Sequence, residues 1–310
     1  MKKIFIILGM LLAFSAAEAA TDCDLHIRVI TPDTEMCGGA PAIGNILSTR
    51  LIRVLTADGV TADSNYGQFY ISGRFDNLYK ETLPGPPTQT VVRTVLTLMV
   101  ADIFGNKVFD SEIFELRGVG TSQQRAYINA VNQLKADNKA LVNFISRAKN
   151  KIISYFDSNY RQLLSKAKTA AARHDFDQAL YFASLIPQCS AGYSEAENVM
   201  LTYYQEYINN EGKILLDKAR AAFSISPDAE GAVKAYGYLQ MIDTDSSAYS
   251  AAQAFAREIG KQTKTEYDFE VHKKYEDKKD IKLKQIDAAR QIGVAFGNGQ
   301  APNTTNILWK

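Results

Sequence analysis

Apolar and polar positions in the first half of the chain predict a small sheet. Apolar residues alternate with polar ones in residues 24–30 and again in 67–78, which is the pattern of half-buried strands. Residues 90–103 and 107–118 are rich in β-branched and aromatic residues, which favour strands. The Phe-Gly-Asn turn at 104–106 joins these two segments. We therefore expect four strands, the last two forming a long hairpin.

Two segments between and after these strands have helical spacing. In residues 42–59 the apolar side chains fall on one face of a helix that ends near Gly59. Residues 121–134 form a second helix, which Thr121 or Ser122 caps. The predicted order is strand, helix, three strands, helix. This order favours an α+β fold in which one sheet carries its helices on one face.

From about residue 138 onward the apolar residues have helical spacing, and part of this sequence is repeated. Residues 163–171 (LLSKAKTAA) match 215–223 (LLDKARAAF), and residues 179–196 match 235–252. Each copy reads as a helix, a turn, a second helix and a turn. A lone helical hairpin cannot bury its apolar face, whereas stacked copies cover one another. We expect the two copies to stack.

The first copy, residues 163–196, resembles a tetratricopeptide repeat. Asp175 and Phe176 stand at the turn between the helices, and Pro187 ends the second helix. The second copy departs from that pattern, with Asp243 where the proline would be. The resemblance implies an all-α, tetratricopeptide-like region with long helices, whose role is protein binding.

The first half also resembles a group of known domains. The element order and the stretch ADIFGNKVFDSEIFELRGVGTSQQRAYINAV (101–131) are similar to small α+β domains of bacterial envelope assembly proteins. These are the N-terminal domain of TolB and the domains of the curli secretion protein and flagellar T-ring protein families. The resemblance implies a place in the cell envelope.

The N-terminus predicts export. Lys2 and Lys3 precede an apolar run from Ile4 to Phe14, and Ala-Glu-Ala follows at 17–19, the order of a secretory signal peptide. The apolar run is shorter than the about 20 residues that a bilayer span needs, and we expect no membrane span after cleavage. The protein should be periplasmic or secreted in a bacterium. The predicted parts are a signal peptide (1–19), an α+β domain (20–136), a helical repeat domain (137–294) and a C-terminal tail (295–310).

Charge and composition narrow the choice of partners. The chain has 35 Lys and Arg against 34 Asp and Glu, and without Lys2, Lys3 and Glu18 the two counts are equal. Nucleic-acid binding rewards a strong basic excess, so we expect no nucleic acid partner.

The sequence offers little catalytic chemistry. None of the histidines His26, His174 and His272 has a second histidine at metal-binding spacing. Acidic residues such as Asp175 and Asp243 fall in turns, where capping is their usual role. We expect no enzyme, no cofactor and no metal. A secreted hydrolase acting on glycans or peptides, and a soluble carrier of a small hydrophobic ligand in the α+β half, remain as alternatives.

Three cysteines reach an oxidising compartment. Cys23 and Cys37 are close enough in sequence to close a short disulfide loop, worth about 3 kcal/mol. Cys189 would then be a buried free thiol.

The main functional prediction is a non-catalytic exported scaffold or binding protein, whose partner is another envelope or secreted protein. The helical repeat region would present a concave surface lined by tyrosines, since tyrosine combines apolar area with a polar tip. The oligomeric state is left open. The predicted contact residues are Tyr181, Tyr203, Tyr207, Tyr238 and Trp309.

Overall fold

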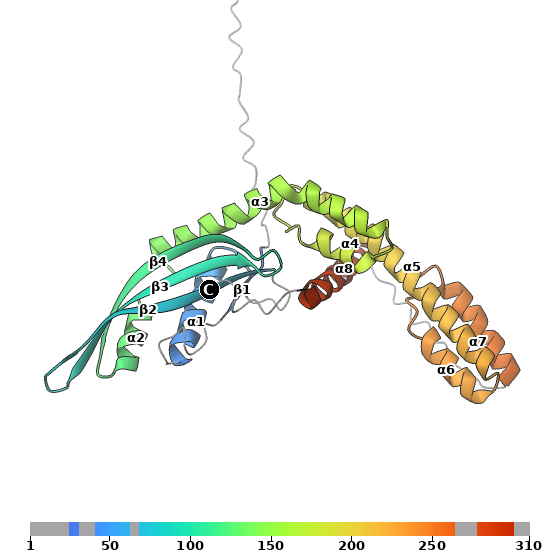
Figure 1. The fold of residues 1–310 in the computed structure, drawn as a ribbon, viewed down its shortest axis with the longest axis horizontal. Coiled ribbons are helices and arrows are strands. Elements are labelled where there is room, and N and C mark those ends of the chain that lie inside the picture. Colours follow the sequence, from blue (N-terminus) through green and yellow to red (C-terminus); the bar gives the residue numbers. More distant parts are fainter. Residues whose placement is uncertain (1–24, 31–40, 63–67, 264–277, 301–310) are drawn as a thin grey trace, which may run out of the picture.

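A four-stranded sheet occupies one end of the molecule and an arm of helices extends from it (Figure 1). The computed structural model describes residues 25–30, 41–62, 68–263 and 278–300. The predicted signal peptide (1–19), Cys23, Cys37 and Trp309 lie outside the described residues.

The α+β prediction is confirmed. The sheet has the strand order β1-β2-β3-β4, in which β1 pairs in parallel with β2 and the other neighbours are antiparallel. The predicted turn at 104–106 joins β3 and β4 into a long hairpin. Ser122 rather than Thr121 caps the helix that follows, by accepting the backbone N–H of Arg125. The elements are β1 (Ile27–Val29), α1 (Pro41–Ala57), β2 (Phe69–Leu83), β3 (Gln89–Asp102), β4 (Lys107–Gly120) and α2 (Gln123–Val131).

Helices cover one face of this sheet, as the sequence predicts. α1 packs closely on β2, because a Cβ atom at Gly73 would lie only 3.0 Å from the side chain of Leu47. Apolar side chains from α1, α2 and the next helix form one buried cluster with the inward residues of β2, β3 and β4. The Phe114 ring stands edge-on to Phe144 within this cluster, at 6.4 Å between centroids.

The helix α3 (Lys139–Ala171) belongs to both halves of the molecule. It starts at Asn138, whose side chain accepts the backbone N–H of Leu141, and at 1.5 Å per residue it is about 50 Å long. Its N-terminal part, as far as Phe156, buries Ile152 and Phe156 in the sheet core. Its second half buries Leu164 and Ala167 among the other helices. The predicted boundary at 136/137 marks the start of this helix, and the sheet core extends beyond it.

The arm consists of two consecutive bundles. The first contains the end of α3, the start of α5, and the helices α4 and α8, since α4 packs against all three of the others. The second contains the end of α5 with α6 and α7. α8 extends six residues into the predicted C-terminal tail, and Phe296 in that extension contacts Tyr181 of α4. The arm helices are α4 (Phe176–Ser184), α5 (Tyr193–Ile225), α6 (Ala229–Leu239), α7 (Tyr249–Thr263) and α8 (Lys278–Gln300).

The sequence repeat reappears in the hydrogen bonds of the two turns that lead into α5 and α7. In the first turn the Asp157 carboxylate of α3 accepts the backbone N–H of Ala191 at 2.7 Å. In the second, the side-chain oxygen of Asn209 on α5 accepts the N–H of Ser247, also at 2.7 Å. Asn209 and Ser247 are the repeat counterparts of Asp157 and Ala191. The two copies therefore build the same local junction between a long helix and a turn.

The expected stacking of the two copies is wrong. α4 packs against α3, α5 and α8, whereas α6 packs against α5 and α7, and the copies follow one another along the arm (Figure 1). The physical reason is the length of α5. Its 33 residues reach past the first bundle, so its second half carries the next hairpin to a new position. A tetratricopeptide arrangement is not confirmed.

Candidate partner-binding surfaces

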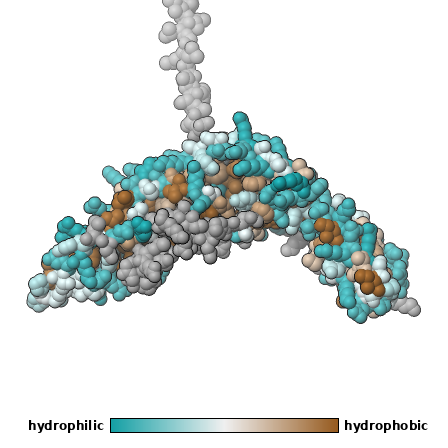
Figure 2. Space-filling model, in the orientation of Figure 1, coloured by the Kyte–Doolittle hydropathy of each residue, from teal (hydrophilic) through white to brown (hydrophobic). Residues whose placement is uncertain are grey.

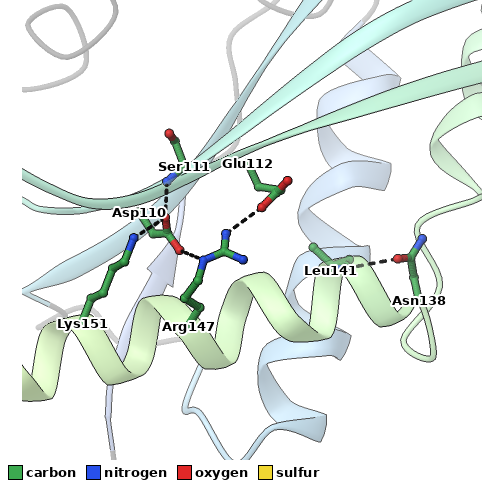
Figure 3. Close-up of polar contacts among 7 residues, drawn as sticks. All are labelled: Asp110, Ser111, Glu112, Asn138, Leu141, Arg147 and Lys151. Carbon is green, nitrogen blue, oxygen red and sulfur yellow. Dashed lines mark hydrogen bonds and ion pairs between the residues drawn. The ribbon is translucent and has the colours of Figure 1, made fainter.

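A cluster of charges links β4 to α3 (Figure 3). Asp110 is buried and accepts hydrogen bonds from Arg147 at 2.6 Å and from Lys151 at 2.8 Å. Arg147 also donates to Glu112 at 2.6 Å. Burial by itself would raise the pKa of the Asp110 carboxyl, but the bonds from Lys151 and Arg147 outweigh it and hold that pKa below its usual value. Asp110 is therefore a charged anchor between the edge strand and the long helix.

A shallow basic hollow of ≈ 480 Å³ lies beside this cluster. Arg147, Lys151 and Tyr155 of α3 form one wall, and Lys107 at the start of β4 lies opposite them. The ammonium group of Lys107 stands 4.3 Å from the centre of the Tyr155 ring, a cation–π contact that leaves its charge without a paired carboxylate among the described residues. No pattern in the sequence predicts this hollow, because its two walls are far apart along the chain.

Tyr181, one of the predicted contact residues, lies at the seam between the sheet and the arm. Its ring is edge-on to Phe104 of the β3–β4 turn at 5.8 Å, and it contacts Phe296 of α8 at 5.6 Å. Burial, and then the charge of Asp102, raise the pKa of the Tyr181 hydroxyl. A Cβ atom at Gly297 would lie 2.7 Å from the Tyr181 ring, so the contact depends on a glycine there. The Tyr181 side chain therefore makes contacts within the protein.

Asp102 holds the turn that carries Phe104. The Asp102 carboxylate is buried and accepts the backbone N–H groups of Phe104 at 2.8 Å and Gly105 at 3.0 Å. Gln68 donates to its other oxygen at 3.1 Å. Burial raises the pKa of Asp102 although these three bonds oppose the shift. Burial, and then the Asp102 charge, also raise the pKa of Tyr70 to about 12.

A small hollow of ≈ 160 Å³ lies along the same seam. Leu25 and Gln68 line it from the sheet, Pro187 from the turn after α4, and Arg290 from α8. Arg290 also donates to the Tyr193 hydroxyl at 3.1 Å. Pockets for small organic ligands usually enclose about 300–1,000 Å³, so this hollow does not favour the alternative of a ligand carrier.

Tyr203 and Tyr207 face inward. Both pack against the small residues Ala170 and Ala179 in the first bundle. Burial raises the pKa of both hydroxyls, with Glu206 adding to the shift at Tyr203 and Asp177 at Tyr207. Tyr203 and Tyr207 are thus partly buried side by side in the first bundle.

Tyr238 is the exposed one of the four predicted tyrosines. It lies on α6 in the second bundle, and 37% of its surface is accessible. Val233, also on α6, is 69% exposed, and Met241 in the turn after the helix is 68% exposed. Gly237 lies between them at four-residue spacing, and nothing approaches within 4 Å of the position that its Cβ would occupy. Figure 2 shows apolar patches, in brown, at this end of a mainly hydrophilic arm.

Acidic residues in the turns of the arm cap backbone N–H groups. Asp175 accepts the backbone N–H of Gln178 at the start of α4, and Asp228 accepts those of Glu230 and Gly231 at the start of α6. Asp243 accepts the N–H of Asp245 in a turn. Within the described ranges, no three or more His, Cys, Asp or Glu side chains gather as they would around a metal ion. In the same residues, no helix is both long enough and apolar enough to cross a membrane.

Cys189 is disulfide-bonded, so the prediction of a free thiol is wrong. The chain has only two other cysteines, Cys23 and Cys37, both outside the described residues. A bridge from Cys189 to either one excludes the predicted Cys23–Cys37 pair. The prediction rested on closeness in sequence alone.

Comparison with known proteins gives only weak likeness to solved structures. No protein-family model matches the chain, and no curated protein is similar to it. Among solved structures, the chain is similar to a minor lipoprotein from Acinetobacter baumannii, at 18% identity, over 41% of this chain and 94% of that chain. The TM-score is 0.27. A likeness of this size shows neither a family nor a function.

Proposed function

We propose that this chain is a non-catalytic, exported binding protein of the bacterial cell envelope, and that its helical region makes the protein contact. The signal-peptide pattern at 1–19 supports export. The use of Asp175, Asp228 and Asp243 as caps supports a structural role for the acidic residues that a hydrolase would need.

One observation carries the proposal, namely the exposed apolar side chains of α6 and of the turn that follows it, which together form one apolar face. Val233 on α6 and Met241 in the turn after it are about two-thirds exposed, and Tyr238 of α6 is 37% exposed. Single exposed apolar side chains are ordinary, but a helix that presents several on its solvent face favours a contact site. The opposite face of α6 buries Ala232, Ala235 and Leu239, so the bundle does not need the outer residues for its own core. The partner is a protein that covers this face with apolar side chains of its own.

The test is affinity capture from a native envelope fraction with the mature chain. The double variant Val233→Ser and Met241→Ser removes the apolar face without touching the bundle core. Leu283→Ser on α8 is the matched control, since Leu283 is 54% exposed and lies outside the second bundle. We expect the wild type and the control to retain the same protein and the double variant to lose it.

The captured protein must then bind the purified chain with the same dependence on Val233 and Met241. Equal capture by all three proteins would contradict the proposed surface. Cleavage of a glycan or peptide library by the purified chain would replace the binding role with that of a hydrolase.

A further inference from the structure

β4 forms one edge of the sheet. At one end of this edge, side chains bond to the outward backbone carbonyls. Backbone groups of successive residues in a strand point alternately toward and away from the neighbouring strand. At the far end of β4 the side-chain amide of Asn129 donates to the carbonyl of Val119 at 2.8 Å. Gln133 donates in the same way to the carbonyl of Arg117. The backbone groups of residues 117 and 119 therefore point away from β3, and side chains of α2 and of the turn after it satisfy their carbonyls.

The same alternation turns the backbone of Ile113 and Glu115 outward. The N–H of Ser111 also turns from β3, toward the Asp110 carboxylate at 3.0 Å. In the described part of the chain, no hydrogen bond between elements and no side chain reaches the outward groups of Ile113 or Glu115. The Ile113 side chain is 64% exposed on the outer face. The middle of β4 is an open edge, a feature that proteins usually cover.

Positive charge borders this open edge. Arg147 and Lys151 reach from α3 to Asp110 and Glu112, which they neutralise. Lys107 adds a further cation that rests on the Tyr155 ring. Three cations thus stand around two carboxylates, in the hollow that adjoins the start of the strand.

We propose that the open edge of β4 receives an extended, acidic segment of a partner protein, which adds to the sheet as a further strand. The backbone of that segment would bond to the outward groups of Ile113 and Glu115. Side chains of an added strand alternate between the two faces. Acidic side chains on the helix-bearing face would then lie near Lys107 and Lys151, and apolar ones on the other face would lie beside Ile113. This proposal concerns the sheet and does not depend on the α6 surface.

The test is fluorescence anisotropy with the full mature chain and a fluorescein-labelled peptide that alternates glutamate and valine. A lysine–valine peptide of the same length is the charge control. We expect the acidic peptide to bind about tenfold or more tightly than the basic one, and high salt to weaken it.

Two variants separate the backbone contribution from the charge contribution. Ile113→Pro removes the outward N–H but no bond to β3, since proline is tolerated on an edge where its N–H faces solvent. We expect it to weaken the acidic peptide about tenfold, whereas Ile113→Thr, which keeps the N–H, retains binding. Lys107→Glu should weaken the same peptide, and Lys168→Glu on the distant half of α3 should not.

Circular dichroism and thermal unfolding establish that each variant is folded. Equal binding of the proline and threonine variants, or of the acidic and basic peptides, would overturn the proposal. Concentration-dependent dimers in light scattering that Ile113→Pro abolishes would assign the edge to a second copy of this chain and overturn it as well.

Discussion

A Cβ atom added to Gly212 on α5 would overlap the hydroxyl oxygen of Ser246 in the turn before α7. The repeat counterpart of Gly212 is Tyr160 on α3, and there the turn supplies the small residue, since a Cβ atom at Gly192 would overlap the Tyr160 ring. Each junction thus pairs a glycine with a larger residue. The glycine lies in the turn in the first copy and on the long helix in the second. In both junctions the long helix and the turn lie in close contact, although different side chains make that contact.

Gly212→Ala should destabilise the second bundle. The added methyl has to displace the buried Ser246, and overpacking of this kind costs about 1–3 kcal/mol. Urea unfolding of the mature chain measures the loss. Gly237→Ala on α6 is the matched control, because its methyl would enter open space and alanine favours a helix by about 1 kcal/mol over glycine. A Gly212→Ala protein as stable as the control would contradict the close contact.

Asp110→Asn should lower the free energy of unfolding at neutral pH by about 1–2 kcal/mol, because its charged hydrogen bonds to Arg147 and Lys151 are lost. The folded pKa of Asp110 lies below its unfolded value, so its contribution is present above about pH 4 and disappears as the pH falls through the folded pKa. The difference in free energy of unfolding between the wild type and the variant should therefore become smaller at acidic pH.

Urea unfolding at pH 7 and near pH 3 checks this pH dependence. Glu112→Gln is the control, since Glu112 is more exposed and bonds to Arg147 alone. A gap for Asp110→Asn that is the same at both pH values would show that its charge is not the source of the stability.

Phe104→Ala should loosen the seam between the sheet and the arm. The variant removes the ring that Tyr181 contacts, at a cost of about 1–3 kcal/mol for a partly buried aromatic. Hydrogen exchange should become faster in the amides of α8, because Phe296 contacts the same tyrosine. Tyr79→Ala, an exposed aromatic on β2, is the control and should leave α8 unchanged. Unchanged exchange in the Phe104 variant would show that the seam has other support.

Thiol titration of the unfolded, unreduced mature protein should find one free thiol, since Cys189 is bridged and the chain has three cysteines. Mass spectrometry of a non-reduced digest should link the Cys189 peptide to that of Cys23 or Cys37. Cys189→Ser should cost about 2–4 kcal/mol of stability. A linked Cys23–Cys37 peptide with free Cys189 would restore the pairing that closeness in sequence suggested.

Much of the fold follows from local patterns. The strands and helices of the first half are readable because each half-buried element repeats its apolar residues with the period of its own geometry. The sequence repeat around Leu163 and Leu215 predicted two helix–turn–helix copies that stack on each other. The way in which the two repeat copies actually pack could not be predicted. The spacing of apolar residues shows which face of a helix is buried, but it does not show which neighbouring helix covers that face. The 33-residue length of α5 decides that arrangement.

The surfaces were harder to predict for a related reason. Tyrosine occurs both in protein cores and at contact sites. The sequence alone therefore does not distinguish the partly buried Tyr203 from the exposed Tyr238. The cluster of Asp110 and Arg147 joins residues 37 positions apart, and neither carries a motif. The open edge at Ile113 follows from strand order, a property of the whole sheet.

The sharing of α3 and α5 has a mechanical consequence. One unbroken helix runs from the sheet core into the first bundle, and another runs from the first bundle into the second. Bending the molecule at either crossing would require breaking several consecutive helical hydrogen bonds, so neither crossing acts as a hinge. We therefore expect the sheet and the two bundles to keep a fixed relative orientation in solution.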